Sequence, residues 1–506
     1  MKKLVVAVLL SLCCLLLTPA LASAAPSVAP IPEAALGLAA VVNLQAALTA
    51  PTPAAYDHFG SSLAVSGNTA LVGAYNRTVN GAADAGAAFV YTRSGATWSR
   101  QARLVASDAA LMDYFGYSVA LSGNTAVVGA YGKTEGGLNS AGAVYVFTRS
   151  GSTWTQQAKL LDPHPVQYEM FGESVALSGD TVLIGAPWKD GTYSRAGTAF
   201  VFTRSGTTWT QQAELLRSNA ANYDYFGQSV ALSGDTALVG VWGKNVFAGA
   251  ANVFTRAGTT WTQQAELSDT ATDAFGWSVA LSGDTALVGA RMTNVGTAAS
   301  AGAAYVFTRA GTTWTKQAKL TAADAASDAE FGSSVALSGN SAVVGAWRKT
   351  VLGHTQAGAS YVFSRQGTTW SARAELRDPN AAADDQFGCS VALSDTTMFS
   401  GADQRTVSGQ AQAGAAYVYR LSPTITKLNP ASGKRGAIVT ISGAFFGAKR
   451  GTSYVKFGAK KCGTYLSWSD NRIRCRVPAK ATLGRLNVRV TTRGGTSNAK
   501  VFTVKR

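Results

Sequence analysis

The segment Phe171-Gly-Glu-Ser-Val-Ala-Leu-Ser-Gly-Asp-Thr-Val-Leu-Ile-Gly-Ala186 is the unit from which most of the chain is built. Its opening Phe-Gly pair occurs seven times, at intervals of 49 to 56 residues. Repeats of this length are typical of propeller blades rather than of helical solenoids. The seven phenylalanines are Phe59, Phe115, Phe171, Phe226, Phe275, Phe331 and Phe387.

Each repeat contains four short segments that predict β-strands, here called A to D. Ser-Val-Ala-Leu-Ser and Thr-Ala-Leu-Val-Gly-Ala alternate their side chains at period two, and the Gly-Asp or Gly-Asn between them indicates a two-residue hairpin. Segments C and D follow in the pattern of 301–320. Four-stranded sheets of this kind bury their faces by stacking around a central axis. We therefore expect an all-β fold with a seven-bladed β-propeller at 42–421.

The seventh repeat lacks its segment D, because it ends at Arg420 without a Trp-Thr-Gln-Gln sequence. Residues 42–48 supply a match. Their Gln45, Ala46 and Leu48 precede the first Phe-Gly as the Gln, Ala and Leu of the other D segments precede theirs. A strand at 42–48 is therefore expected to pair with the open edge of blade seven and close the ring.

The N-terminus predicts export. Two lysines precede the apolar run Leu4–Leu17, and Ala22-Ser-Ala24 fits a cleavage site, so residues 1–24 are interpreted as a secretory signal peptide. The apolar run is shorter than the roughly 20 residues that span a bilayer. An Ala/Pro-rich leader at 25–41 follows, and we expect no transmembrane segment in the mature chain.

The formal net charge of +16 comes from one end of the chain. Residues 423–506 hold 18 Lys and Arg against a single acid, Asp470, whereas the region from 25 to 422 holds 24 bases and 27 acids. In an exported protein, a basic surface attracts acidic polysaccharides, envelope phosphates or other polyanions. The alternative is a solvated basic surface without a dedicated partner.

Within that domain Arg472, Arg474 and Arg476 alternate along one predicted strand, so they project from the same face. A disulfide between Cys462 and Cys475 is expected in an exported domain. Lys460 and Lys461 would join the arginines if that disulfide draws their segment alongside. The candidate polyanion-binding residues are Lys460, Lys461, Arg472, Arg474 and Arg476. The remaining mature cysteine, Cys389, is expected to be a half-buried spare thiol.

Together with the Phe-Gly pairs, the Val-Gly-Ala triplets at 72–74, 128–130, 288–290 and 344–346 resemble the FG-GAP repeats of integrin-α-like propellers and their bacterial relatives. In such propellers some A–B connections are Asp-rich and bind calcium. The A–B connections here are as short as Ser-Gly-Asp-Thr and offer too few oxygens for the roughly six to eight that calcium takes. We expect no metal and no cofactor.

Residues 423–506 resemble an IPT/TIG domain, which is an immunoglobulin-like β-sandwich. Pro423–Pro430, Val439–Gly443 and Ile473–Pro478 carry the resemblance. Short alternating segments separated by turn signals favour the same sandwich. Some domains of this family contact DNA in transcription factors, but a signal peptide argues against specific nucleic-acid binding here.

Few residues predict catalysis. His58, His164 and His354 stand in different repeats, so a zinc site lacks ligands. Gly132-Lys-Thr134 is similar to the end of a phosphate-binding loop, but Val127 replaces the required first glycine. We therefore expect a protein that is not an enzyme.

The candidate ligand site lies on the face formed by the B–C and D–A connections, which alone vary in length and sequence. After the Val-Gly-Ala equivalents, most repeats place an aromatic residue, a base or both, a combination suited to sugars or acidic groups. The candidate ligand-binding residues are Tyr75, Arg77, Tyr131, Lys133, Trp188, Lys189, Trp242, Lys244, Trp347, Lys349 and Arg405.

Acids stand on the same face, two residues before Phe-Gly in six repeats. Two structural interpretations of these acids are open: they pair with the bases, or they accept backbone N–H groups at the start of strand A. A third interpretation gives them catalysis in a polysaccharide-active enzyme, which needs two carboxylates about 5–10 Å apart. The acids are Asp57, Asp113, Glu169, Asp224, Asp273 and Asp385.

These observations predict a secreted or cell-surface protein that functions in binding or adhesion. Its expected ligand is a glycan or an extracellular protein, and its basic domain is expected to contact an anionic polysaccharide or envelope surface. The chain is expected to be a monomer. The alternatives are a polysaccharide-active enzyme and a purely structural envelope or matrix component.

Overall fold

The structure is a computed structural model that describes residues 42–269, 273–447, 449–492 and 494–506. The predicted signal peptide and leader lie outside the described residues. Strands dominate the described chain, together with one short helical turn, α1 (Lys244–Phe247). No helix in these ranges is long and apolar enough to cross a membrane.

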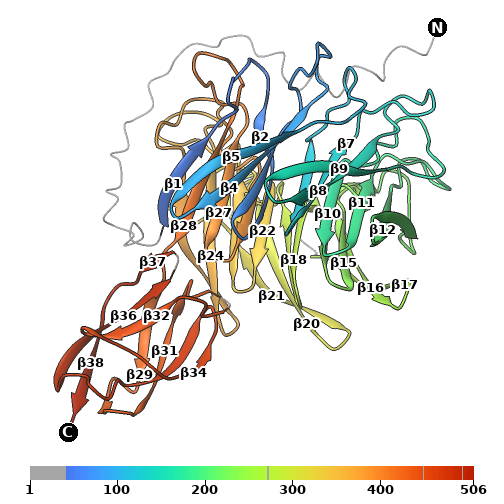
Figure 1. Cartoon of the computed structure of the whole chain (residues 1–506). Helices are drawn as coiled ribbons and strands as arrows, with labels where there is room; N and C mark the ends of the chain where they lie inside the picture. Colours follow the sequence, from blue (N-terminus) through green and yellow to red (C-terminus); the bar gives the residue numbers. More distant parts are fainter. Residues whose placement is uncertain (1–41, 270–272, 448, 493) are drawn as a thin grey trace. The chain divides into compact units, whose positions relative to one another are not determined.

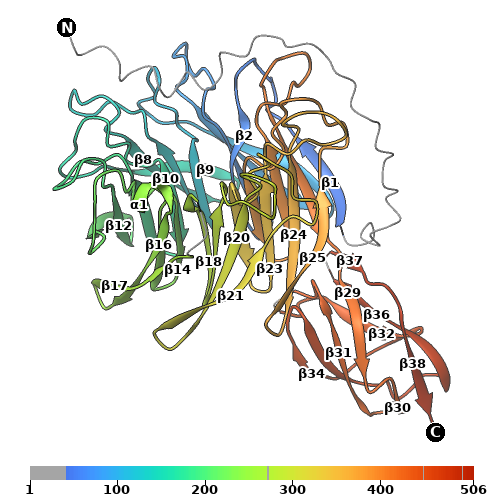
Figure 2. The same ribbon diagram turned by 180° about the vertical axis from the view of Figure 1, so that it is seen from behind.

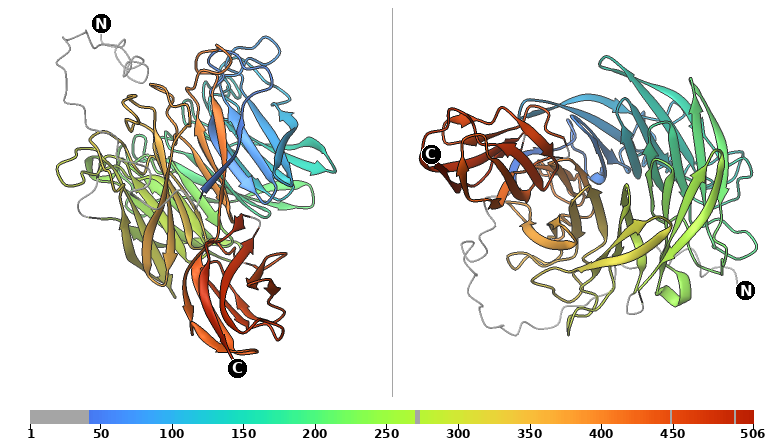
Figure 3. Two further views of the ribbon diagram at one scale, coloured as in Figure 1. Left: turned by 90° about the vertical axis from the view of Figure 1, so that its left-hand side faces the viewer. Right: turned by 90° about the horizontal axis from the view of Figure 1, so that it is seen from below.

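Seven four-stranded antiparallel sheets confirm the predicted propeller, and their colours succeed one another around the ring in Figure 3. In blades one to six the sheet order follows the chain. Blades one to three are β2 (Phe59–Ser66), β3 (Thr69–Ala74), β4 (Ala87–Ser94), β5 (Thr97–Leu104); β6 (Ser118–Ser122), β7 (Thr125–Ala130), β8 (Ala143–Ser150), β9 (Thr153–Leu160); β10 (Ser174–Ser178), β11 (Thr181–Ala186), β12 (Thr198–Ser205) and β13 (Thr208–Leu215). Blades four to six are β14 (Val230–Ser233), β15 (Thr236–Val241), β16 (Ala250–Ala257), β17 (Thr260–Leu267); β18 (Phe275–Ser282), β19 (Thr285–Ala290), β20 (Ala303–Ala310), β21 (Thr313–Leu320); β22 (Ser334–Ser338), β23 (Ser341–Ala346), β24 (Ala359–Gln366) and β25 (Thr369–Leu376).

Blade seven is closed by the N-terminal strand, as predicted. It consists of β26 (Val391–Ser394), β27 (Thr397–Ala402), β28 (Ala415–Leu421) and, at its outer edge, β1 (Val42–Leu48). β1 pairs antiparallel with β28, so the first and last strands of the ring lie side by side (Figure 1).

The Phe-Gly pairs fill the space between neighbouring blades. Phe115 is completely buried and packs against Tyr145 and Phe147 of strand C, with ring centroids 5.5 and 6.0 Å apart. The glycine after it, Gly116, has a φ of 95°, and a Cβ there would lie 2.5 Å from the Ala87 carbonyl oxygen. The pair is therefore required by close packing, which explains why it recurs in every repeat.

Adjacent blades are also joined by hydrogen bonds from strand A. The hydroxyl of Ser118 donates to the Gly172 carbonyl of the next blade at 2.7 Å. Equivalent serines in the other six blades make the same bond, including Ser390, which reaches Gly60 at 2.6 Å across the closure. The ring is thus linked by the same contact at every blade boundary.

The C-terminal domain is the predicted sandwich of two sheets. One sheet has the order β29-β31-β35-β34, and the other contains β30, β38, β36, β32 and β33, with β37 beside β36. The strands are β29 (Thr424–Asn429), β30 (Ser432–Lys434), β31 (Ile438–Ala444), β32 (Tyr454–Phe457), β33 (Lys460–Lys461), β34 (Tyr465–Trp468), β35 (Arg472–Arg476), β36 (Gly484–Thr492), β37 (Gly495–Thr496) and β38 (Lys500–Lys505).

Candidate functional site

The B–C and D–A connections form one face of the propeller, here called the variable face, at the upper ends of the blades in Figure 2. Each D–A connection lies alongside the B–C connection of the preceding blade. For example, Gly86 and Phe115 form a parallel bridge, and the backbone N–H of Tyr114 donates to the Asp84 carbonyl at 3.0 Å. These bonds tie the loops of neighbouring blades together.

The acids two residues before Phe-Gly hold these loops in shape. Oδ2 of Asp113 accepts the backbone N–H of Ala110 at 2.7 Å and Nζ of Lys133 at 3.0 Å. Asp57, Asp224 and Asp385 each accept the N–H three residues earlier in the same way. Both structural interpretations of the acids therefore apply at once.

The candidate bases of the variable face lie in ion pairs with acids. Lys133 and Lys349 are buried, with exposed fractions of 5% and 6%. Nearby acids compensate the charge of these bases. The basic residues of the predicted ligand site are therefore part of the propeller's own loop structure. The ion pairs are Arg77 with Asp57, Lys133 with Asp113, Lys189 with Glu169, Lys244 with Glu266, Lys349 with Asp324, and Arg405 with Asp385.

Three of the aromatic candidates meet the residue that follows a Phe-Gly pair. The ring of Tyr117 lies 5.4 Å from that of Tyr75 and 4.6 Å from that of Tyr131. Trp277 lies 5.2 Å from Trp242. The A strands contact one another around the ring, so they line the axis and bring these aromatic side chains together at its variable end. The rings are half-buried because they pack on each other.

Of the other two aromatic candidates, Trp188 is joined to Trp242 through Tyr225, which stacks on Trp242 at 5.1 Å, and Trp347 contacts an acid. Trp188 packs edge-on against Tyr225, 5.3 Å away. Nε1 of Trp347 donates to Oε2 of Glu330 at 3.1 Å. Sequence reasoning missed Tyr117 and Trp277, although the position after Phe-Gly varies between repeats while its neighbours do not. That variability was the available signal.

A carboxyl group with a raised pKa lies beside the aromatic residues: it belongs to Glu173, which also follows a Phe-Gly pair. Its Oε1 accepts a hydrogen bond from Nε2 of Gln228 at 2.9 Å. Burial raises the pKa of Glu173 to about 7, even though the hydrogen bond from Gln228 favours the carboxylate. Glu173 is therefore partly protonated near neutral pH.

The C-terminal domain presents unpaired positive charge. Within its described residues no Lys or Arg takes part in an ion pair, and its single acid, Asp470, is largely buried and accepts the Gly447 N–H at 3.0 Å. Arg472, Arg474 and Arg476 are exposed on one side of β35, while Ile473 and Cys475 face the core. The prediction that the three arginines share a face is confirmed.

Lys460 and Lys461 do not join that face, so this part of the prediction is wrong. They form β33, which pairs with β32 in the other sheet, with Lys461 opposite Lys456. The segment extends the sheet of β32 instead of lying beside β35.

The sequence profile of the FG-GAP repeat matches seven segments that begin at the closure strand and cover most of the propeller. They are residues 42–91, 98–147, 154–202, 209–254, 261–307, 314–363 and 370–419.

The chain belongs to the FG-GAP repeat family.

Each FG-GAP match runs from strand D of one blade to strand C of the next, because the first begins at Val42 in β1. The IPT/TIG domain profile matches residues 423–504, in agreement with the sandwich. The family membership and the two-domain fold thus agree.

This FG-GAP protein is also similar to cyclomaltodextrin glucanotransferases over a short stretch. The identity is 38% over 77 residues for the enzyme of Bacillus sp. (strain 17-1) and 37% over 92 residues for one from Niallia circulans. These stretches are 15% and 17% of this chain, which spans only 11% and 13% of the length of those relatives. The similarity thus concerns one module of each enzyme.

A solved structure of a fungal alcohol oxidase of the AA5 family, in complex with copper, is similar at 13% identity with a TM-score of 0.47. The similarity covers 92% of this chain and 100% of that chain.

The cysteine pair of the FG-GAP protein's TIG domain differs from the prediction. Cys462 and Cys475 are buried free thiols, so the predicted disulfide is not formed in the structure, and Cys389 is free as well. Sγ of Cys462 donates to the carbonyls of Thr464 and Arg476, at 3.2 and 3.0 Å. Its hydrogen bond with Cys475 lowers the pKa of Cys462 to about 7.

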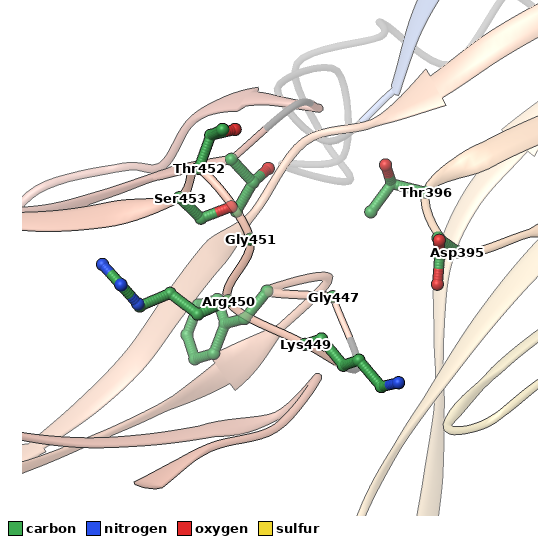
Figure 4. Close-up of a pocket in the computed structure, with 10 residues that line it drawn as sticks. Asp395, Thr396, Gly447, Lys449, Arg450, Gly451, Thr452 and Ser453 are labelled. Carbon is green, nitrogen blue, oxygen red and sulfur yellow. The ribbon is translucent and has the colours of Figure 1, made fainter. Parts of the chain in front are cut away.

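A pocket of about 430 Å³ lies where the TIG domain meets the A–B turn of blade seven (Figure 4). Hydrogen bonds near it join the same domains: Nε2 of Gln366 donates to the Gly443 carbonyl at 2.8 Å, and Nδ2 of Asn471 to the Arg365 carbonyl at 3.2 Å. The pocket is lined by Asp395, Thr396, Phe446, Gly447, Lys449, Arg450, Gly451, Thr452, Ser453 and Thr492.

The described residues contain no group of three or more His, Cys, Asp or Glu side chains that could hold a metal ion. The A–B connections, where calcium-binding relatives carry their ligands, are two-residue turns such as the one between β10 and β11. Independence from calcium stays a prediction.

Proposed function

We propose that the protein is an exported, non-enzymatic binding or adhesion protein that presents the variable face of its propeller to a glycan or an extracellular protein. A second surface, the exposed arginine strand of the TIG domain, contacts anionic polymers. The predicted signal peptide at 1–24 supports a secreted or cell-surface location.

One observation carries this proposal: the exposed large apolar side chains of the propeller gather on the variable face. Among the described propeller residues, only Leu44 of β1 lies elsewhere. Exposed apolar clusters on one face indicate an interaction surface. The residues are Tyr56, Leu111, Met112, Leu161, Val166, Tyr168, Tyr193, Leu216, Tyr223, Val246, Phe247 and Leu352.

The arrangement of the acids favours binding over catalysis. Asp57, Asp113, Asp224 and Asp385 hold backbone N–H groups and bases, which ties them to loop structure. A glycosidase needs one carboxylate kept protonated beside a second that stays ionised. These four near-identical clamps offer no such difference, which supports a binding role for them, and only Glu169, whose pKa burial and the neighbouring Asp162 raise to about 8, departs from the pattern.

The arginine strand supports the second surface. Arg472, Arg474 and Arg476 have no acid paired with them, and the neighbouring strand β31 places Ser442, Thr440 and Ile438 opposite them. A row of exposed guanidinium groups suits phosphate, sulfate or carboxylate groups along a polymer.

The propeller surface is tested by binding to arrays of neutral glycans and extracellular proteins. The double variant Tyr168→Asn/Tyr223→Asn removes two aromatic side chains, and Thr207→Asn/Thr259→Asn is the matched control on exposed turns of the opposite face. We expect the first variant to lose about tenfold in affinity, or 1.4 kcal/mol, and the control to bind like the native chain. Absence of any ligand, or equal binding by both variants, contradicts the proposal.

The TIG surface is tested with heparin as a sulfated probe. Affinity should fall steeply between about 50 and 200 mM salt, because binding releases counterions. Arg472→Thr/Arg474→Thr/Arg476→Thr, which keeps strand propensity, should bind more weakly and with a shallower salt dependence. An unchanged slope would show that the charge is diffuse. Shortening of any bound polymer during incubation would instead identify an enzyme.

A further inference from the structure

Charge is segregated along this molecule. The connections of the variable face hold 19 acidic and 11 basic residues, whereas the TIG domain holds one acid and 18 bases. Burial raises the pKa of Glu169 to about 8 and that of Glu173 to about 7, but acids outnumber bases on this face even when both are protonated. Nine of these acids and three of these bases are buried, so the connections carry an excess of negative charge that is partly internal, whereas the TIG domain carries an excess of positive charge.

The variable face of blades one to four is also apolar, at positions where the backbone is unfavourable. Tyr56, Met112, Tyr168 and Tyr223 stand three residues before Phe-Gly, with φ between 58° and 64° and exposed fractions between 51% and 57%. Left-handed backbone is unfavourable for a non-glycine residue. Because these four side chains are largely exposed, burial within the chain offsets little of this unfavourable backbone energy.

The backbone conformation itself belongs to the fold, but the bulky side chains do not. Asp328 has the same place in blade six, with a φ of 58°, and its N–H donates to the Ala299 carbonyl at 2.8 Å. Tyr168 makes the equivalent bond to Asn139 at 2.9 Å. Asp tolerates this conformation better than Tyr or Met. The apolar residues of blades one to four thus serve something other than loop geometry.

The variable face of blades one to four is here called the sector. Its side chains limit the kinds of partner that it can bind. Five of its six loop bases are in ion pairs, and the sixth, Arg195, stacks over Trp188 at 4.7 Å. With its bases engaged, the sector disfavours a polyanion. Its exposed Leu, Val and Met side chains favour a protein surface over a sugar, and its excess of acids favours a basic one.

We propose that this acidic, apolar sector binds the TIG domain of a second copy of the chain. The docking surface on that copy is the outer side of its β29-β31-β35-β34 sheet, which carries the row Arg472, Arg474 and Arg476 and, at the end of that row, Ile438, itself 36% exposed and opposite Arg476. Lys427 lies on the same sheet, opposite Ser442. This surface offers the basic side chains that the sector lacks, and an apolar side chain that could pack against those of the sector.

The contact is heterologous, because it joins two different surfaces. Each copy keeps one surface free, so association continues from copy to copy as an open chain. The inference rests on the proposed function only in using the same face of the propeller. It replaces the expectation of a monomer with salt-sensitive self-association.

Sedimentation velocity of the full chain tests the proposal. At about 100 µM protein and 50 mM salt we expect species larger than a monomer, and at 500 mM salt a shift towards the monomer, because exposed charges are screened. Tyr168→Asn/Tyr223→Asn and Arg472→Thr/Arg474→Thr/Arg476→Thr should each stay monomeric. Circular dichroism melting checks that both variants are folded.

A mixture of the two variants is the decisive sample. Each variant retains the surface that the other lacks, so an equimolar mixture should form a dimer and nothing larger. A monomeric native chain, association that only one variant abolishes, or a mixture without dimers overturns the proposal. These measurements contain no ligand. Loss of self-association with intact array binding therefore rejects this inference alone, and the reverse result rejects the proposed function alone.

Discussion

The indole Nε1 of Trp154 donates a hydrogen bond to Oε1 of Gln101 in the preceding blade, at 2.8 Å. The same Trp–Gln bond joins four further pairs of blades. Blade seven has Val42 where other blades have this Trp, and blade six accordingly carries Arg373 where the others have the Gln. A glutamine therefore stands at this position of strand D where the next blade supplies an indole N–H from which it can accept a hydrogen bond.

Replacing Gln101 by Leu should leave the Trp154 N–H without its partner. We expect the free energy of unfolding to fall by about 1–2 kcal/mol, measured by urea denaturation. Gln101→Glu is the matched control, because a carboxylate oxygen can still accept the indole N–H. Equal losses from the two substitutions would show that the hydrogen bond is not the cause.

The closure strand should contribute strongly to stability. Leu48 of β1 is 6% exposed and belongs to the core between blades seven and one. Leu48→Ala should therefore cost about 2–5 kcal/mol, and deletion of 42–48 should cost more and expose the edge of β28. Thermal melting and light scattering check both. Unchanged melting of the deletion variant would refute closure as a stabilising contact.

The pKa of Glu173 predicts a pH dependence. Its folded value of about 7 lies above the ordinary 4.5, so between those values the native state binds more protons and its stability falls as pH rises. Glu173→Gln removes this loss and should be more stable than the native chain above pH 7, by on the order of 3 kcal/mol. Denaturation at pH 5 and pH 8 measures it. A constant difference between the two proteins at both pH values would contradict the assignment.

Calcium should not affect stability. Only a ligand that binds the folded state raises the apparent melting temperature, and the two-residue A–B turns offer no ligand set. Melting in calcium and in a chelator should coincide. A calcium-dependent rise of several degrees would reveal a site outside those turns.

The thiols of Cys462 and Cys475 should oxidise to a disulfide readily. Their mutual hydrogen bond places them side by side and lowers the pKa of Cys462 to about 7, which enriches the reactive thiolate. Treatment with oxidised glutathione should remove two hydrogen atoms without adding glutathione, as read by intact mass. Cys462→Ser is the control. A stable mixed disulfide in the native chain would show that the pair cannot close.

The repeat could be read from sequence because its causes are local. Phe115 and Gly116 recur as a pair since packing demands both, and the vacancy in blade seven was visible because residues 42–48 match segment D. The contacts within the candidate site were harder to predict from the sequence. Lys133 and Asp113 are 20 residues apart, and only the three-dimensional loop geometry makes them an ion pair.

Contacts between neighbouring blades near the axis could not be predicted either. Tyr75 and Tyr117 come from different blades and meet only because the ring brings the starts of the A strands together. The positions of Lys460 and Lys461 depended on which sheet the short β33 joins, a choice that the local sequence does not determine. The left-handed backbone of Tyr168 was equally invisible, because tyrosine is not a residue that signals it.

The pairing of Val42 with Leu421 has a consequence for how the ring is made. During synthesis β1 is made before the other propeller strands, but its partner β28 is made after all of them. Blade seven therefore cannot be completed in the order of the chain, as the other blades can. Until then β28 exposes an unpaired edge that fits β1 of any copy equally well. At high local concentration, newly made chains should therefore exchange β1 with one another, giving strand-swapped oligomers whose blades are all intact.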